Sequence, residues 1–332
     1  MKRATMRDVA VEAGVSEATV SRVLNDTGPV AVDTREKVYK AAKNLRFSVS
    51  KSAASLASGR TMRIGVLLPF RINSWFNATV LEGLFKSADK HDFEVVPFIM
   101  RSENDLQNFF SMLPIRGNVD AIIVLSFKLA DEQTQELTHL GMPCIGVDTP
   151  DGTEFDSSVG IDDMSAMQAA VKKLMELGHT EIAYVGRTSG SRFTNTTAVR
   201  ENGFIQAIKD NGLDINRCPV LHSDNDVSAT VERIQLLSSV PTALCVEDDD
   251  LAVRIVRGLR SVNLRVPEEF SVLGFDDDRI ASAIDLSTVH QDPRALGIRA
   301  IEIALQLLDD KTKHVHEVMP TRIVLRSTTA RR

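Results

Sequence analysis

The sequence has no apolar run that approaches the roughly 20 residues needed to cross a bilayer, so we expect no transmembrane segment. Its first residues, MKRATMRD, lack the apolar stretch of a signal peptide, so we expect no export and a cytoplasmic location. Cys144, Cys218 and Cys245 are far apart and form no C-x-x-C pair, which is typical of reduced core thiols. No His or Cys stands at metal-ligand spacing, and we predict neither a metal site nor a cofactor.

Acidic residues outnumber basic ones overall, but not at the start of the chain. The 332 residues, enough for two or three domains, carry a net charge of −6. Residues 1–60 hold 11 Lys and Arg against 6 Asp and Glu, which leaves the remainder at −11. A basic head on an acidic body suits a protein that places one module on nucleic-acid phosphates and holds the rest away.

Residues 5–25, TMRDVAVEAGVSEATVSRVLN, predict two short helices joined by a tight turn. Gly14 ends the first helix, because glycine adopts the left-handed conformation at least cost, and Ser16 suits the N-cap of the second. The apolar residues recur at helical spacing: Val9, Ala10, Ala13, Val20, Val23 and Leu24. This pattern fits a helix-turn-helix whose second helix enters a DNA major groove, and on periodicity alone it fits a plain helical hairpin equally well.

A third helix is predicted to follow and to close a small core. The segment REKVYKAAKNL places Val38, Ala41, Ala42 and Leu45 on one face. Asp33 or Thr34 can cap its N-terminus, and the basic side chains of its outer face can reach phosphate.

The full string is far more specific than its periodicity. Residues 8–25 resemble the hallmark of the lactose-repressor (LacI/GalR) family, DVAxxAGVSxxTVSRVLN, and every fixed letter is present. The resemblance implies that Arg22 pairs with guanine, that Glu17 accepts from cytosine or faces solvent, and that Ala18 touches a thymine methyl. It also implies phosphate contacts from Thr5, Ser16, Thr19, Ser21 and Asn25.

A stretch of small residues, SKSAASLASG, spans residues 50–59. Its composition favours a flexible tether, since a short helix nucleates poorly in water. The resemblance instead implies a hinge helix that orders only on DNA, with Leu56 wedged into the minor groove beside Ala53. Ser50 and Lys51 stand where the family usually has Asn and Arg, so a backbone contact is expected to differ there.

From residue 62 onward, apolar strands alternate with helices, which predicts doubly wound parallel sheets. The expected strands are 63–69, 93–100, 120–126, 143–147, 182–186, 219–222, 243–246 and 270–275. The expected helices are 78–91, 106–113, 131–140, 166–177, 197–211, 227–237 and 250–263. The chain is thus predicted to carry an all-α helix-turn-helix head and two α/β lobes that resemble periplasmic sugar-binding proteins.

We predict a DNA-binding domain at 1–49, a hinge or linker at 50–61, and a two-lobed effector-binding and dimerisation domain at 62–332. The family resemblance implies three crossings between the lobes. It gives a first lobe of about 62–161 and 292–320, and a second lobe of about 162–291 and 321–332.

Polar and aromatic residues follow the predicted strands at the edge where ligands bind in α/β sheets. The candidate effector contacts are Phe70, Ser74, Trp75, Phe76, Ser126, Asp148, Phe193, Arg200, Asp249, Asp276 and Gln291. Carboxylates accept from vicinal hydroxyls and aromatic faces pack on sugar C–H groups, so the set suits a neutral polyhydroxylated ligand. The family resemblance points to Asp148, Arg200, Asp249, Asp276 and the loop after the first strand.

Each of these residues also has a purely structural interpretation. Asp249 fits a helix N-cap, Asp276 fits turn chemistry, Arg200 fits a helix surface, and Trp75 and Phe76 fit the lobe core.

The cleft departs from the family pattern at three places. The chain has Ser74-Trp75-Phe76-Asn77 where the family often has N-P-F-F. It has DDDLA at residues 248–252 where the family often has N-D-x-x-A. It has Ala198 where the family often has an additional Arg, two residues before the position of Arg200. With few cations in the cleft, a phosphorylated or anionic effector is disfavoured, and a pentose, hexose, disaccharide or inositol-like polyol all remain open.

The sequence therefore predicts a transcriptional regulator, not an enzyme: a repressor of carbohydrate-use genes that binds operator DNA and a sugar or polyol. The chain shows no terminal leucine heptad, so a homodimer is the simplest assembly. Three alternatives are a sugar-binding transport protein, a sugar-modifying enzyme using Asp249 and Asp276, and a regulator controlled by a partner protein.

Overall fold

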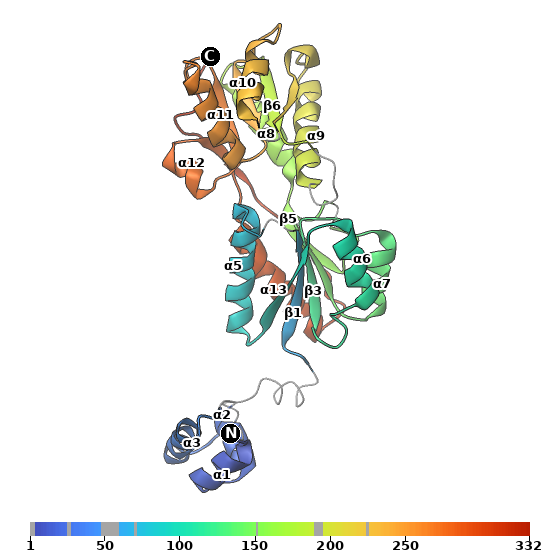
Figure 1. The fold of residues 1–332 in the computed structure, drawn as a ribbon, viewed down its shortest axis with the longest axis vertical. Coiled ribbons are helices and arrows are strands. Elements are labelled where there is room, and N and C mark those ends of the chain that lie inside the picture. Colours follow the sequence, from blue (N-terminus) through green and yellow to red (C-terminus); the bar gives the residue numbers. More distant parts are fainter. Residues whose placement is uncertain are drawn as a thin grey trace. The chain divides into compact units, whose positions relative to one another are not determined.

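The computed structural model describes residues 4–24, 28–47, 60–69, 72–150, 152–188, 195–223 and 226–332. Its contacts divide the chain into two units, residues 1–62 and 63–332. Figure 1 shows a helical head and a body of two α/β lobes. Within the described ranges, no helix has both the length and the apolar character needed to cross a membrane.

The head is a bundle of three helices around a small apolar core. They are α1 (Met6–Ala13), α2 (Glu17–Leu24) and α3 (Val32–Asn44). Gly14 ends α1 at a φ of 67°, and the Ser16 Oγ accepts from the Thr19 amide at 3.1 Å to cap α2, as predicted. The core is Val9, Ala10, Val20, Val23, Val38, Ala41 and Ala42. The predicted cap of α3 is wrong, because that helix begins at Val32 and its N-cap, Ala31, has no side-chain oxygen.

The first lobe contains a parallel sheet of six strands in the order β11-β5-β4-β3-β1-β2. The strands are β1 (Arg63–Pro69), β2 (Glu94–Met100), β3 (Ala121–Leu125), β4 (Cys144–Val147), β5 (Ser157–Ile161) and β11 (His316–Met319). The helices are α5 (Trp75–Lys90), α6 (Glu103–Met112), α7 (Asp131–His139) and α13 (Pro293–Asp309). In Figure 1, α5 and α13 lie on one side of the sheet and α6 and α7 on the other.

The second lobe contains another six-stranded sheet, in the order β12-β10-β9-β8-β6-β7, with only β12 antiparallel to its neighbour. The strands are β6 (Ile182–Gly186), β7 (Val220–His222), β8 (Ala243–Val246), β9 (Ser271–Asp276), β10 (Ser287–His290) and β12 (Arg322–Val324). The helical elements are α8 (Asp163–Glu176), α9 (Asn195–Asp210), η2 (Ile215–Arg217), α10 (Val227–Gln235), α11 (Asp249–Ser261) and α12 (Arg279–Ala283).

Each sheet of the body buries both faces, as its continuous apolar strands predict. In β6, Ile182 and Tyr184 belong to the core under α8 and α9, whereas Ala183 and Val185 belong to the core under α10 and α11. This alternation follows the two-residue period of a strand. The predicted class, a helix-turn-helix head with two doubly wound lobes, is confirmed.

The chain passes between the lobes three times. It leaves the first sheet after β5, returns after β10 as α13 and β11, and leaves again to form β12. The carboxyl ends of β4 and β5 thereby come close to the start of α8, and polar residues from both lobes gather there.

Two glycines allow α5 and α13 to pack closely. A Cβ at Gly83 would lie 2.2 Å from the Arg294 carbonyl oxygen, and a Cβ at Gly297 would lie 2.2 Å from the Val80 carbonyl oxygen. Real Cβ atoms do not approach backbone so closely, so any side chain there must push the two helices apart.

We therefore expect Gly297→Ala to destabilise the body by about 1–3 kcal/mol, the usual cost of overpacking a core. Urea denaturation of the full chain, followed by far-UV circular dichroism, measures this. Gln306→Ala, on the exposed side of the same helix, is the control and should be nearly neutral. Equal stability of the two variants would contradict the tight α5–α13 contact.

Candidate functional site

The second helix of the head presents a small polar surface to solvent. Glu17, Ala18 and Arg22 are exposed, whereas Val20 and Val23 of the same helix are buried. Positions 17, 18 and 22 lie on one side because helical neighbours recur every three to four residues. A carboxylate, a methyl and a guanidinium side by side can read the donor, acceptor and methyl pattern of a major groove.

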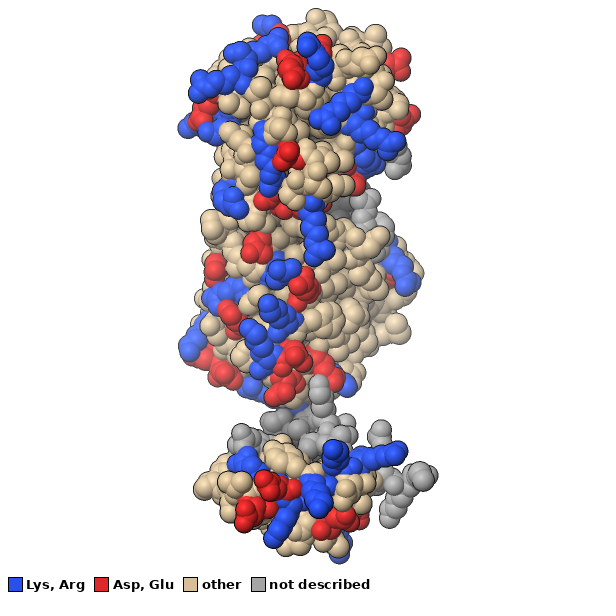
Figure 2. Space-filling view, turned by 90° about the vertical axis from the view of Figure 1, so that its left-hand side faces the viewer, with Lys and Arg blue, Asp and Glu red and all other residues tan. Residues whose placement is uncertain are grey.

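Two of the predicted phosphate contacts, Thr5 and Ser16, cap helices, and a third, Thr19, contacts the Ser16 side chain. The Thr5 hydroxyl donates to the Asp8 Oδ2 at 2.7 Å within a capping box, and the Ser16 and Thr19 hydroxyls are 2.9 Å apart. Ser21 is half-buried on α2. Five other predicted DNA contacts lie outside the described residues: Asn25, Ser50, Lys51, Ala53 and Leu56. Figure 2 shows acidic side chains beside basic ones on the head, so basic charge alone does not identify the DNA-facing surface.

A hollow of about 400 Å³ lies between the lobes of the body. The first lobe contributes Asp148, the end of β5 and Glu317 of β11, and the second lobe contributes Asp163, Thr196 and Val199. A small molecule in this hollow contacts both lobes at once, so its binding depends on how the lobes are placed.

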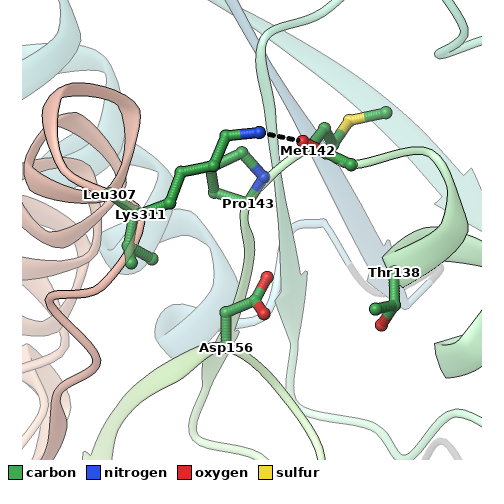
Figure 3. A pocket seen from close by; sticks show the side chains of 7 residues that line it. Thr138, Met142, Pro143, Asp156, Leu307 and Lys311 are labelled. Atoms are coloured by element: carbon green, nitrogen blue, oxygen red, sulfur yellow. Dashed lines mark hydrogen bonds between the residues drawn. The ribbon is translucent and has the colours of Figure 1, made fainter.

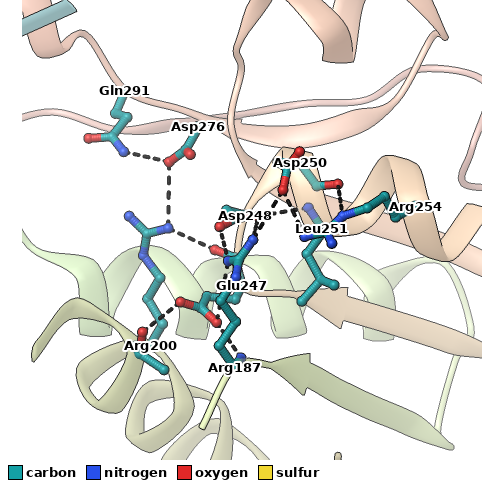
Figure 4. Close-up of polar contacts among 10 residues, drawn as sticks. Arg187, Arg200, Glu247, Asp248, Asp250, Leu251, Arg254, Asp276 and Gln291 are labelled. Carbon is teal, nitrogen blue, oxygen red and sulfur yellow. Dashed lines mark hydrogen bonds and ion pairs between the residues drawn. The ribbon is translucent and has the colours of Figure 1, made fainter. Parts of the chain in front are cut away.

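Arg200, on α9, is the centre of the polar network beside this hollow. It is only 6% exposed, and its Nε donates to the Asp163 Oδ1 at 2.7 Å. One terminal nitrogen donates to the Glu247 carbonyl oxygen at 2.7 Å and lies 3.5 Å from the Asp276 Oδ1 (Figure 4). The guanidinium also stacks 3.6 Å from the centre of the Phe275 ring. The helix-surface interpretation of Arg200 is therefore excluded.

Burial and mutual repulsion shift the pKa values of the surrounding carboxyl groups. Burial raises the pKa of Asp148 to about 8, Asp163 adds to this shift, and Arg200 opposes it. Burial likewise raises the pKa of Asp276 to about 7 and that of Asp163 above its usual range, against Arg200 in both cases. The pKa values of all three carboxyl groups around this guanidinium are therefore raised, and Asp148 is mostly protonated at neutral pH.

Two other predicted residues lie in or near this network. The Gln291 amide nitrogen donates to the Asp276 Oδ1 at 2.7 Å, and its own carbonyl oxygen is buried without a hydrogen-bond partner in the described structure. Ser126 follows β3 in a left-handed conformation, with a φ of 60°, and its buried hydroxyl also lacks a partner there.

The remaining predicted cleft residues are placed differently. Ser74 caps α5 by accepting from the Asn77 amide at 3.3 Å, and Trp75 and Phe76 are half-buried at the start of that helix, outside the lining of the hollow. Phe70 and Phe193 lie outside the described residues.

The placement of Asp249 in the cleft is corrected by the structure. Asp248 is the N-cap of α11, so Asp249 begins the helix and turns into the second lobe, where it is fully buried. Its two oxygens accept from the Thr288 hydroxyl at 2.7 Å and the Asp278 amide at 3.0 Å. Asp249 therefore ties α11 to β10 and to the turn after β9.

The candidate effector contacts chosen from the sequence left out three residues that organise the second-lobe edge. Glu247 accepts from the Thr197 hydroxyl at 2.6 Å and from the Arg187 amide at 2.5 Å. The Arg187 side chain pairs with Asp248 and Asp250 (Figure 4). Asp163, the partner of Arg200, follows β5 in the string GIDD, which was a visible signal because polar residues after a strand reach the ligand edge.

A smaller hollow, of about 210 Å³, lies on the first lobe beside α13 (Figure 3). Lys311 spans it and donates to the Gly141 carbonyl oxygen at 2.7 Å, and Asp156 accepts from the Cys144 amide at 2.8 Å. The charged groups of this hollow, Lys311 and Asp156, are therefore already hydrogen-bonded to backbone atoms. No group of three or more His, Cys, Asp or Glu side chains suited to a metal ion occurs among the described residues.

The raised pKa of Asp148 predicts a pH-dependent stability. The folded protein keeps this proton from about pH 4, where the unfolded chain loses it, up to about pH 8. Stability is therefore lost as the pH rises through this window, by at most about 1.4 kcal/mol per pH unit.

Asp148→Asn removes this loss, so the variant should gain stability relative to the parent between about pH 5 and about pH 8. Urea denaturation at each pH measures the difference. Asp131→Asn, at an exposed position on α7, is the control. Its free energy of unfolding should differ from that of the parent by the same amount at every pH. A constant offset for Asp148→Asn as well would show that its carboxyl titrates normally.

Two family descriptions match the chain. Residues 5–50 match the description "Bacterial regulatory proteins, lacI family", and residues 171–329 match a periplasmic binding protein-like domain. The chain is 31% identical to the HTH-type transcriptional regulator RegA of Clostridium saccharobutylicum, covering 92% of this chain and 93% of the relative. It is 28% identical to catabolite control protein A of Priestia megaterium, covering 98% and 99%.

Two solved structures share the fold of this chain over almost its full length. A lac repressor dimer bound to operator and the anti-inducer ONPF superimposes with a TM-score of 0.82 at 26% identity, covering 99% of this chain and 100% of that one. The transcriptional regulator CelR in complex with cellobiose shares the fold, with a TM-score of 0.69 at 24% identity and coverage of 98% and 100%.

Proposed function

Because this chain belongs to the lacI family of bacterial regulatory proteins, we propose that it represses transcription as a cytoplasmic homodimer on a two-fold-related operator. We propose further that a small sugar or polyol, bound between the lobes, releases the operator. The relatives are transcriptional regulators, and we infer that this chain likewise regulates and catalyses no reaction.

One observation carries the proposal: a single chain holds both an exposed reading surface and a hollow whose lining comes from both lobes. The reading surface is Glu17, Ala18 and Arg22 on α2. The hollow places Asp148 of the first lobe opposite Asp163 of the second, next to Arg200. A ligand that binds one arrangement of the lobes more tightly shifts the population toward it, and this differential affinity is all that regulation requires.

In the proposed mechanism, two copies of α2 enter successive major grooves, and each Arg22 pairs with a guanine. Residues 50–61 are proposed to act as the hinge, with Ser50, Lys51, Ala53 and Leu56 as DNA contacts. Ligand binding changes the placement of the lobes, and the paired hinges then separate. Several effector contacts are proposed here: Asp148, Asp163, Arg200, Asp276, Gln291 and Ser126.

The test is operator release across a panel of sugars and polyols. Operator DNA is first selected from a random pool with the full-length protein, and its release is then followed by fluorescence anisotropy. Release by at least one sugar or polyol is the expected result. Tight operator binding with no response to any compound, and no heat of binding, would favour control by a partner protein.

A further inference from the structure

Every charged side chain that lines the inter-lobe hollow is acidic. The lining contains Asp148, Asp162, Asp163 and Glu317, and no Lys, Arg or His of the described residues belongs to it. A neutral sugar needs hydrogen-bond donors as well as acceptors from its site, because each sugar hydroxyl is both. The charged groups of this lining are all carboxyl groups, which become pure acceptors when they ionise, and it contains no cation to balance them.

The nearby cations are already committed to other groups. Arg200 binds Asp163, Asp276 and the Glu247 carbonyl oxygen. Arg299 binds Glu317 at 2.8 Å and Glu302 at 3.1 Å. Neither guanidinium has its full set of donors free for a ligand, and each compensates a carboxylate of the lining.

Asp148 is the carboxylate of the lining that is both buried and unpaired. It is 8% exposed, and across the described ranges no basic side chain lies within ion-pair distance of it. Its carboxylate accepts a hydrogen bond from the backbone of Ile161. Asp162, by contrast, is exposed and is used to cap α8 through the Ser165 amide at 2.9 Å and the Ser165 hydroxyl at 2.6 Å.

Two hydroxyls near the ends of β3 and β4 also lack a partner. The Thr149 Oγ1 and the Ser126 Oγ are buried and have no hydrogen bond within the described structure, and Thr149 lines the hollow next to Asp148. An ammonium group has three N–H donors and no acceptor, so a carboxylate flanked by hydroxyl oxygens suits it. A metal ion suits the site less, since no group of three ligating side chains occurs in the described parts of the chain.

We propose that the effector is a polyol that carries an ammonium group, an amino sugar or an aminocyclitol, and that the ammonium binds Asp148. This inference rests on the proposed function, because it names the ligand class of the same hollow. The hydroxyls of such a ligand then meet Asp163, Asp276 and Gln291 at the second-lobe edge.

The proton balance of Asp148 supports this assignment. Burial holds its pKa at about 8, and the charged groups that face it are Asp163 of α8, Arg200 of α9 and Asp276 of β9. A bound ammonium favours the ionised carboxylate, so binding near neutral pH releases a proton. Affinity should therefore rise by up to about tenfold per pH unit below about pH 8 and then level off, as long as the amine stays protonated.

The experiment is isothermal titration calorimetry of the full-length protein with matched pairs that differ in one group. Glucosamine is compared with glucose, galactosamine with galactose, and scyllo-inosamine with scyllo-inositol, in two buffers of different ionisation enthalpy. At least one amine should bind about tenfold or more tightly than its hydroxyl partner, with proton release to the buffer. Asp148→Asn should bring that ratio close to one, and Asp131→Asn should leave it unchanged.

Three results would overturn the inference. If a neutral compound binds as tightly as its amine, or more tightly, the ammonium assignment fails while the proposed function stands. If no compound of either kind binds although operator DNA does, the proposed small-molecule effector fails with it. If the amine keeps its advantage in a folded Asp148→Asn protein, Asp148 is not its partner. The comparison of amine with hydroxyl in the parent protein needs no variant.

Discussion

Replacing Arg200 with methionine should destabilise the two-lobed body by about 3–5 kcal/mol, the usual cost of removing one partner from a buried ion-paired network. Arg200 is 6% exposed, and its Nε lies 2.7 Å from the Asp163 Oδ1, with Asp276 and Asp148 nearby. Although burial opposes it, these carboxylates hold the pKa of Arg200 above its usual range, so the side chain is charged in the folded protein.

Loss of Arg200 should also raise the pKa values of the three carboxyl groups further. The folded state then binds more protons than the unfolded chain over a wider range, so the destabilisation should be larger at about pH 8 than at about pH 5. Arg200→Lys keeps the positive charge but lacks the planar guanidinium that binds two groups at once. The stability of this variant should therefore lie between those of the parent and the methionine variant.

Urea denaturation of the full chain at both pH values measures the effect. Arg254→Met is the matched control, because Arg254 pairs with Asp250 one helical turn away on an exposed surface. That control should change stability by no more than about 0.5 kcal/mol. A loss of similar size in both variants would show that Arg200 is not the centre of the network.

Replacing Arg22 with alanine should weaken operator binding by a factor of about 30 to about 20,000. A bidentate contact to guanine contributes about 1–3 kcal/mol, and a dimer makes two of them. Arg22 is exposed on α2 and Val20 and Val23 hold the helix in the core, so the head should fold normally without this side chain.

The diagnostic readout is the ratio of affinities for operator and random DNA, measured by fluorescence anisotropy at several salt concentrations. Arg22→Ala should lower this ratio steeply. Lys37→Ala, at an exposed position of α3, should weaken binding to both DNAs together and reduce the salt dependence by about two ions, one for each subunit. An unchanged ratio for Arg22→Ala would remove Arg22 from base recognition.

Local signals account for the parts of the fold that the sequence predicted well. Gly14 and Ser16 mark the end of α1 and the start of α2 with their own backbone and side-chain chemistry, so both boundaries were visible without tertiary contacts. Runs such as RIGVLLP and AIIVL identify buried parallel strands. The start of α3 was missed because its first turn has no side-chain cap, so Asp33 and Thr34 were the nearest available signals.

The sequence did not show which side chain at the start of a helix faces the ligand edge. Residues 247–250 are four consecutive acidic side chains, and along a helix successive side chains point about 100° apart. Which of them faces the ligand edge therefore depends on where α11 begins, and Asp249 turned inward because Asp248 supplies the cap. The pairing of Asp163 with Arg200 was equally hidden, since it joins residues 37 positions apart on two helices.

The measurement that tests the account most directly is operator affinity with the inter-lobe hollow empty and then saturated by the compound that calorimetry identifies. Saturation should lower operator affinity by a factor of about 5–150, and operator DNA should lower the affinity for that compound by the same factor, because the coupling is reciprocal. Equal operator affinity in the two states would contradict the proposal that this hollow controls DNA binding.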